Sequence, residues 1–195
     1  MLTFLLHKMR QNINFALLKS LGIMETPFVY DRYVTSKYFI GRKKECGILG
    51  NLLAAGEHVV IYEPPKTGKM SLIQQTLINM RSSGMQFMTV CLDMFNVRSL
   101  DEFLLRFGTT VMKAALSTPD QYKDAIARHL SDTHFVFDRE RFYQEGSIVS
   151  LNWSPDRNDM EKMMRLPGLL ALEKGVPFYL IFKEFQTIMN SPEYE

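Results

Sequence analysis

Residues 63–71 form the part of the chain whose residue types and spacing best suit phosphate chemistry. They read Glu-Pro-Pro-Lys-Thr-Gly-Lys-Met-Ser, so that Gly68 directly precedes Lys69. A glycine lets the backbone approach a phosphate closely, and a lysine ammonium supplies a point charge for the phosphate oxygens. If a helix begins directly after the glycine, its unpaired N–H groups offer further donors to the same anion. The segment therefore predicts a phosphate-binding loop.

The elements that must position such a loop are a strand before it and a helix after it. Residues 58–62 are a short apolar run typical of a buried parallel strand, and residues 70–81 carry apolar side chains at helical spacing. A polar loop that only joins a strand to a helix is the alternative, and the sequence leaves it open. On the first interpretation, the residues that surround the phosphates are Pro64, Pro65, Lys66, Thr67, Gly68, Lys69, Met70 and Ser71.

Two positions of the loop depart from the phosphate-loop pattern G-x-x-x-x-G-K-[ST]. Glu63 stands at the first glycine, and Met70 stands at the hydroxyl that holds Mg²⁺. Ser71 does not replace that hydroxyl, because one step along a helix turns a side chain by about 100°. A carboxylate near bound phosphates is repulsive, so Glu63 favours a loop that binds no nucleotide, whereas Lys69 favours one that does.

A second group of residues with a possible role in catalysis follows the apolar run 177–182, which predicts a third buried strand. In phosphate-loop ATPases such a strand ends in Asp-Glu, where the aspartate holds Mg²⁺ through water and the glutamate polarises the attacking water. Glu184 fits the second role and is the candidate catalytic residue, while Lys183 occupies the aspartate position. Both metal-binding side chains are thus replaced, which predicts weak or absent Mg²⁺ binding and impaired hydrolysis. The four histidines and two cysteines show no metal-ligand spacing, so we expect no other metal site.

The remaining elements predict an α/β domain, because strands and helices alternate along the chain. A further strand is expected over residues 87–92, and short strands over 135–138 and 148–153. Ser99 and Glu102 form a capping box that opens a helix. Other helices are expected over residues 43–55, over 119–130, and from 154 onward, the last kinked or broken at Pro167-Gly168.

A third motif, Phe39-Ile40-Gly41-Arg42 followed by Glu45, resembles the entry box of AAA-type and STAND-type P-loop ATPases. Together with the loop and the end of the third strand, it makes residues 27–186 similar to the archaeal-type ATPase family that also occurs widely in bacteria. The resemblance implies a three-layer α/β P-loop NTPase fold with a parallel sheet, and ATP or ADP as ligand. It also implies that Ile40 and Gly41 lie near the adenine. Members of the family act as nucleotide-driven switches or motors.

The resemblance further implies that the sheet is incomplete at its C-terminal side. In the family another strand inserts beside the strand that ends in Asp-Glu, whereas only residues 185–195 follow here. We therefore expect a protein partner or self-association to complete the sheet. The alternative function is a non-enzymatic interaction module, or a truncated remnant, that binds no nucleotide.

Composition and charge exclude several classes of protein. The chain of 195 residues is 46% hydrophobic and 23% charged, which excludes intrinsic disorder. Residues 1–23 carry three basic residues and no acidic one, and they predict a basic amphipathic extension before a domain over 24–195. That domain has a net charge of −1, which gives no case for nucleic acid binding. No apolar run approaches the ~18 residues of a membrane-spanning helix, so we expect a cytoplasmic protein and no integral membrane segment.

Overall fold

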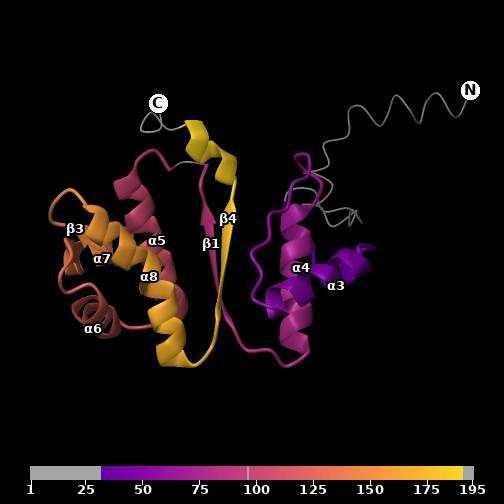
Figure 1. The fold of residues 1–195 in the computed structure, drawn as a ribbon, viewed down its shortest axis with the longest axis horizontal. Coiled ribbons are helices and arrows are strands. Elements are labelled where there is room, and N and C mark those ends of the chain that lie inside the picture. The colour runs from indigo at the N-terminus through magenta and orange to yellow at the C-terminus, as the bar shows by residue number, and fades with distance from the viewer. Residues whose placement is uncertain (1–31, 96, 191–195) are drawn as a thin grey trace, which may run out of the picture. The chain divides into compact units, whose positions relative to one another are not determined.

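The computed structural model describes residues 32–95 and 97–190 (Figure 1). The chain divides into two compact units between Gly84 and Met85, and each unit is described here by itself. The amphipathic extension expected over residues 1–23 lies outside the described residues. Within the described ranges, no helix combines the length and the apolar character needed to cross a membrane.

The first unit is built on two helices, α3 (Lys43–Ala54) and α4 (Lys69–Ser82). A short 3-10 helix, η1 (Ser36–Tyr38), precedes them. The helices expected over 43–55 and 70–81 are confirmed. They pack through a small apolar cluster of buried side chains, and partly buried apolar side chains surround it. The buried members are Cys46, Leu49 and Leu72.

The segment before the phosphate loop differs from its prediction. Residues 57–64 belong to neither a helix nor a strand, although a buried strand was expected over 58–62. Val60 and Tyr62 are 92% and 97% exposed, while Ile61 packs against the α3–α4 cluster. An apolar run becomes a strand only when a neighbouring strand supplies a hydrogen-bonded ladder. None of the described residues supplies one here, and the predicted buried strand is therefore wrong.

The second unit contains a parallel pair of strands, β1 (Met88–Asp93) and β4 (Phe178–Lys183). These strands confirm the expectations over 87–92 and 177–182. Their register sets Val90 opposite Leu180 and Asp93 opposite Lys183. The coarse fold class is thereby confirmed as mixed helix and strand, with a small parallel sheet of two strands in the described chain.

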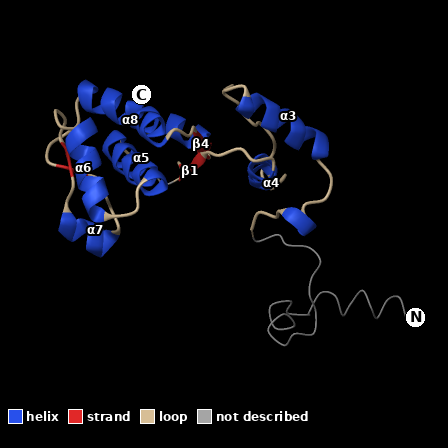
Figure 2. Ribbon diagram, turned by 90° about the horizontal axis from the view of Figure 1, so that it is seen from below, coloured by secondary structure: helices blue, strands red, loops and turns tan. Residues whose placement is uncertain are grey.

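Four helices connect the two strands of this sheet. In chain order they are α5 (Leu100–Ala115), α6 (Pro119–His129), α7 (Arg139–Glu145) and α8 (Arg157–Lys174). The short strands β2 (Phe135–Val136) and β3 (Ser150–Leu151) pair antiparallel beside them. Figure 2 shows α5 and α8 side by side next to β1 and β4, and the contacts between these elements agree. A final 3-10 helix, η2 (Phe185–Asn190), follows β4.

The core of the second unit lies between α5, α8 and the strands. Phe107 is fully buried and stacks on Phe182 of β4, with ring centroids 6.3 Å apart. The helix α8 continues through Pro167, which is buried, so the expected break does not occur there. The single tryptophan, Trp153, lies just after β3 and is 75% exposed. Other fully buried side chains of this core are Leu104, Val111, Met112, Met163, Leu166 and Leu170.

Candidate phosphate-binding loop

Gly68 is the residue at which the loop turns into α4. Its φ of 84° lies in the left-handed region, which a glycine adopts without steric cost. No side chain caps the start of α4, and its first turn carries no acidic residue. The first N–H groups of a helix have no partner within the helix. The start of α4 therefore presents open donors and the positive end of its dipole, as the sequence predicts for a phosphate site.

The Lys69 side chain folds back over the loop. Its Nζ donates to the carbonyl oxygen of Glu63 at 2.8 Å and to that of Pro64 at 3.1 Å. The Thr67 hydroxyl also donates to the Pro64 carbonyl, at 2.9 Å. Lys66, with a φ of 64°, is exposed at the turn. The loop is thus closed on itself, and an incoming anion would compete with two backbone carbonyls for the ammonium.

Arg42 links the start of α3 to this loop. One guanidinium nitrogen, Nη2, lies 2.6 Å from Glu63 Oε1, and Nη1 donates to the Thr67 carbonyl at 3.1 Å. The third nitrogen, Nε, lies 3.1 Å from Glu45 Oε1. In the sequence Arg42 is part of the entry-box motif, and its link to the loop was not predicted. The signal that could have found it is Glu63, because a carboxylate in a phosphate loop needs a nearby cation.

Glu63 holds a negative charge inside the loop. The neighbouring Thr67 hydroxyl and the Arg42 guanidinium lower the pKa of Glu63 below its usual range, so the side chain stays ionised at neutral pH. Its second oxygen, Oε2, is buried and has no hydrogen-bond partner. Of the two carboxylate oxygens, only Oε1 therefore has a hydrogen-bond partner.

The residues that would hold Mg²⁺ do not suit the ion. Met70 has no hydroxyl, and the neighbouring Ser71 is buried. The Ser71 hydroxyl oxygen accepts from the Val34 N–H at 2.9 Å, so it is used to anchor the segment before η1. The expectation that Ser71 does not replace the missing hydroxyl stays a prediction.

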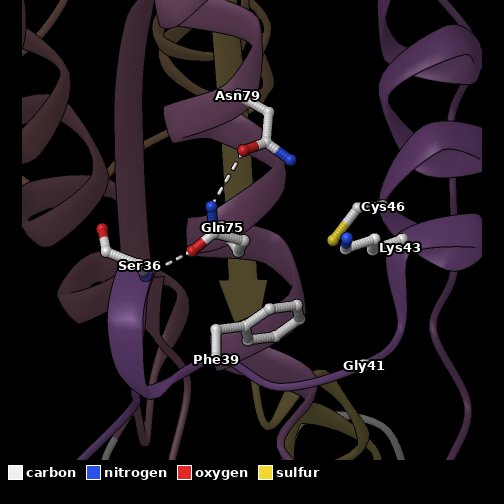
Figure 3. Close-up of a pocket in the computed structure, with 7 residues that line it drawn as sticks. All are labelled: Ser36, Phe39, Gly41, Lys43, Cys46, Gln75 and Asn79. Atoms are coloured by element: carbon white, nitrogen blue, oxygen red, sulfur yellow. Dashed lines mark hydrogen bonds between the residues drawn. The ribbon is translucent and has the colours of Figure 1, made fainter.

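A pocket of about 430 Å³ lies between α3, α4 and the segment after η1. Gln75 and Asn79 face Lys43 and Cys46 across it, and the Phe39 ring lies at one end (Figure 3). Gln75 accepts from the Ser36 N–H at 2.6 Å and donates to Asn79 at 2.8 Å. The complete lining is Ser36, Phe39, Gly41, Lys43, Cys46, Gln75 and Asn79.

Of the two residues expected near an adenine, the pocket includes one. Gly41 lines it and has a φ of 81°, whereas Ile40 is 88% exposed and is not part of the lining. The pocket combines an aromatic ring with side-chain amides, and these groups can stack on a base and hydrogen-bond to its edge.

The candidate catalytic residue, Glu184, belongs to the second unit. It follows β4 with a φ of 51°, is exposed, and accepts from Gln186 at 2.6 Å. Its neighbour Lys183 pairs with Asp93 at 2.6 Å, and this contact lowers the pKa of Asp93 and raises that of Lys183. Asp93 was not among the site residues predicted from the sequence. The signal was available, because parallel strands bring their C-terminal ends to the same edge.

A histidine and two aspartates come together at the start of α8. The ligand atoms of His134, Asp156 and Asp159 lie within 4.8 Å of one another, although no ligand spacing was seen in the sequence. Asp159 is fully buried and accepts from His134 Nδ1 at 2.7 Å and from the backbone N–H groups of His134 and Asp156. Asp156 caps α8 in return. These bonds account for the cluster as a helix cap.

Comparison of the chain with protein-family models, with curated proteins and with solved structures found no match in any of the three.

Proposed function

We propose that this chain binds ATP or ADP, with the phosphates on residues 64–71 at the start of α4. The single observation that carries the proposal is the open, uncapped start of α4 at Gly68 with Lys69 as its first residue. A helix start of this kind, preceded by a loop with a flexible glycine and followed by a lysine, has the donors and the charge that a phosphate requires. The proposed fold is the three-layer P-loop NTPase fold of AAA-type or STAND-type ATPases, incomplete at its C-terminal side.

The base of the nucleotide is proposed to enter the pocket lined by Phe39 and Gly41. A volume of about 430 Å³ is within the range of small-molecule sites. Arg42 joins pocket and loop, because its neighbours Gly41 and Lys43 line the pocket while its guanidinium reaches Thr67. The sites proposed for the base and for the phosphates are therefore adjacent within one unit.

Hydrolysis is proposed to be impaired. Met70 offers no ligand for Mg²⁺, and in the sequence motif Lys183 stands at the position of the aspartate that would hold the ion. Glu184 remains as the candidate residue for polarising water, and neither motif supplies a side-chain ligand for the ion. We therefore propose a nucleotide-binding switch domain rather than an efficient ATPase.

The test is a titration of the purified chain with a fluorescent ADP analogue. Lys69→Ala should weaken binding about 10–100-fold, because it removes a charge-assisted hydrogen bond to the phosphates. Lys44→Ala is the matched control, since it removes the same charge from an exposed position on α3 outside the loop, and it should change the affinity less than about threefold. Chelation of Mg²⁺ should have little effect. Equal affinities of the wild type and Lys69→Ala would contradict the proposal.

A second candidate function is a module that binds a protein and no nucleotide. The observation that favours it is the exposed apolar segment around Val60 and Tyr62, which has no strand partner among the described residues. A strand from another chain could pair with such a segment. On this alternative, the double variant Val60→Lys, Tyr62→Lys no longer binds a protein partner or no longer self-associates. Neither the wild type nor any variant binds the ADP analogue.

A further inference from the structure

We propose that the Glu63 carboxylate is an internal competitor of the phosphate ligand and thereby sets the affinity of the loop. The inference rests on the proposed function, because it concerns the same site. Glu63 is the first residue of the loop, and its carboxylate pairs with Arg42, whose guanidinium also holds the Thr67 carbonyl. A nucleotide phosphate bound in the loop would lie near this negative charge.

The contacts around Glu63 show which bonds an anion would exchange. The loop cations Lys69 and Arg42 are both engaged within the loop: Lys69 with two carbonyls, and Arg42 with the Glu63 carboxylate and the Thr67 carbonyl. An incoming phosphate has to draw Lys69 away from the carbonyls. It also has to tolerate or displace the carboxylate on Arg42.

The state of the carboxylate explains why it can be displaced. One oxygen is held by Arg42 at 2.6 Å, but Oε2 is buried without a hydrogen-bond partner. A buried carboxylate oxygen without a donor is unfavourable, so the hydrogen bonding of the carboxylate itself depends on its contact with Arg42. A rotation of the Glu63 side chain toward solvent would relieve that oxygen and leave Arg42 facing the loop.

The chain provides a matched control for this inference. Glu45 also pairs with Arg42, through Nε at 3.1 Å, but it lies in the first turn of α3 and not in the loop. Glu45→Gln and Glu63→Gln remove the same charge from the same guanidinium. Only the second removes a charge from the loop itself, so a difference between them reports on the position of Glu63.

Three variants of the full chain test the competitor role by titration with a fluorescent ADP analogue. Glu63→Gln should bind about tenfold more tightly than the wild type, because one nearby like charge is removed at unchanged size. Glu45→Gln should stay within about threefold of the wild type. Arg42→Gln should bind about tenfold more weakly, because it leaves the Glu63 charge unneutralised. Binding that appears only in Glu63→Gln, and is lost again with Lys69→Ala, would also support the inference.

The opposite results have different meanings. If Arg42 and Glu63 only brace the loop, Glu63→Gln weakens binding as Arg42→Gln does, and the inference is overturned while nucleotide binding stands. An equal gain in Glu45→Gln and Glu63→Gln also overturns it. Absence of binding in the wild type and in every variant overturns the proposed function as well. Glu63→Gly, checked by thermal melting, replaces Glu63→Gln if that variant does not fold.

Discussion

The two units of the chain begin their helices in opposite ways. In the second unit every described α-helix has a side-chain cap: Ser99 on α5, Thr118 on α6, Asp138 on α7 and Asp156 on α8. In the first unit α3 and α4 begin at the left-handed residues Arg42 and Gly68, and neither start has a side-chain cap. The second unit thus satisfies its own helix donors, whereas the first leaves them open at the residues of the candidate site.

This contrast indicates where binding can occur. A capped helix start gains about 1 kcal/mol from its own side chain and has little to offer a ligand. An uncapped start retains unpaired donors, and it is stabilised when an anion occupies it. The second unit is also the one with the deep apolar core. The proposed ligand site therefore belongs to the unit with the smaller core.

The largest expected effect concerns the cores of the two units. Phe107→Ala should lower the free energy of unfolding of the second unit by about 3–5 kcal/mol, because the side chain is fully buried between α5 and β4. Leu49→Ala in the small cluster of the first unit should cost about 2 kcal/mol, the lower end for a buried leucine. Chemical denaturation measures both. Equal losses would mean that the first unit is as well packed as the second.

Substitution of two helical glycines by alanine should have smaller effects on stability, and the two effects should have opposite signs. A Cβ added at Gly108 would lie 2.8 Å from Met163 Cε and 3.1 Å from Val149 Cγ2, both inside the core, so Gly108→Ala should destabilise by about 1–3 kcal/mol. At Gly50 on α3 the nearest atom is Thr76 Cγ2 at 3.6 Å, an ordinary contact. Gly50→Ala should therefore stabilise by about 0.5–1 kcal/mol. Thermal melting of the two variants measures both effects. A lower melting temperature of Gly50→Ala would show tighter α3–α4 packing than these distances indicate.

The smallest effect is a pH dependence of the second unit. Asp159 raises the pKa of His134 above its usual value of about 6.5, so the charged pair stabilises the fold fully below that pH. The contribution is lost as the pH rises through the raised pKa, because the neutral imidazole no longer carries the charge that attracts the carboxylate. Melting temperatures between about pH 6 and pH 8 should fall slightly in the wild type and stay level in His134→Gln. His129→Gln is the control, and the fall should persist in it; a fall in His134→Gln would contradict the assignment.

The sequence predicted what depends on neighbours along the chain. The capping residue Ser99, the glycine turn at Gly68 and the two paired strands follow from local pattern, and the structure confirms them. Residues 58–62 could form a strand only if a neighbouring strand paired with them. The hydrophobic periodicity of the sequence does not show whether such a neighbour is present. The Arg42–Glu63 and Lys183–Asp93 pairs join residues 21 and 90 positions apart. Such contacts arise from tertiary placement, which composition and spacing do not encode.

The position of the single tryptophan has a consequence for spectroscopy. Trp153 is exposed and belongs to the second unit, so its indole is already in contact with water before unfolding and its emission reports little about the first unit. Tyr62 is 97% exposed and directly precedes Glu63. Tyr62→Trp combined with Trp153→Phe would move the sole indole to the first unit, one residue before Glu63. Its emission would then give an optical signal from the first unit that needs no labelled nucleotide.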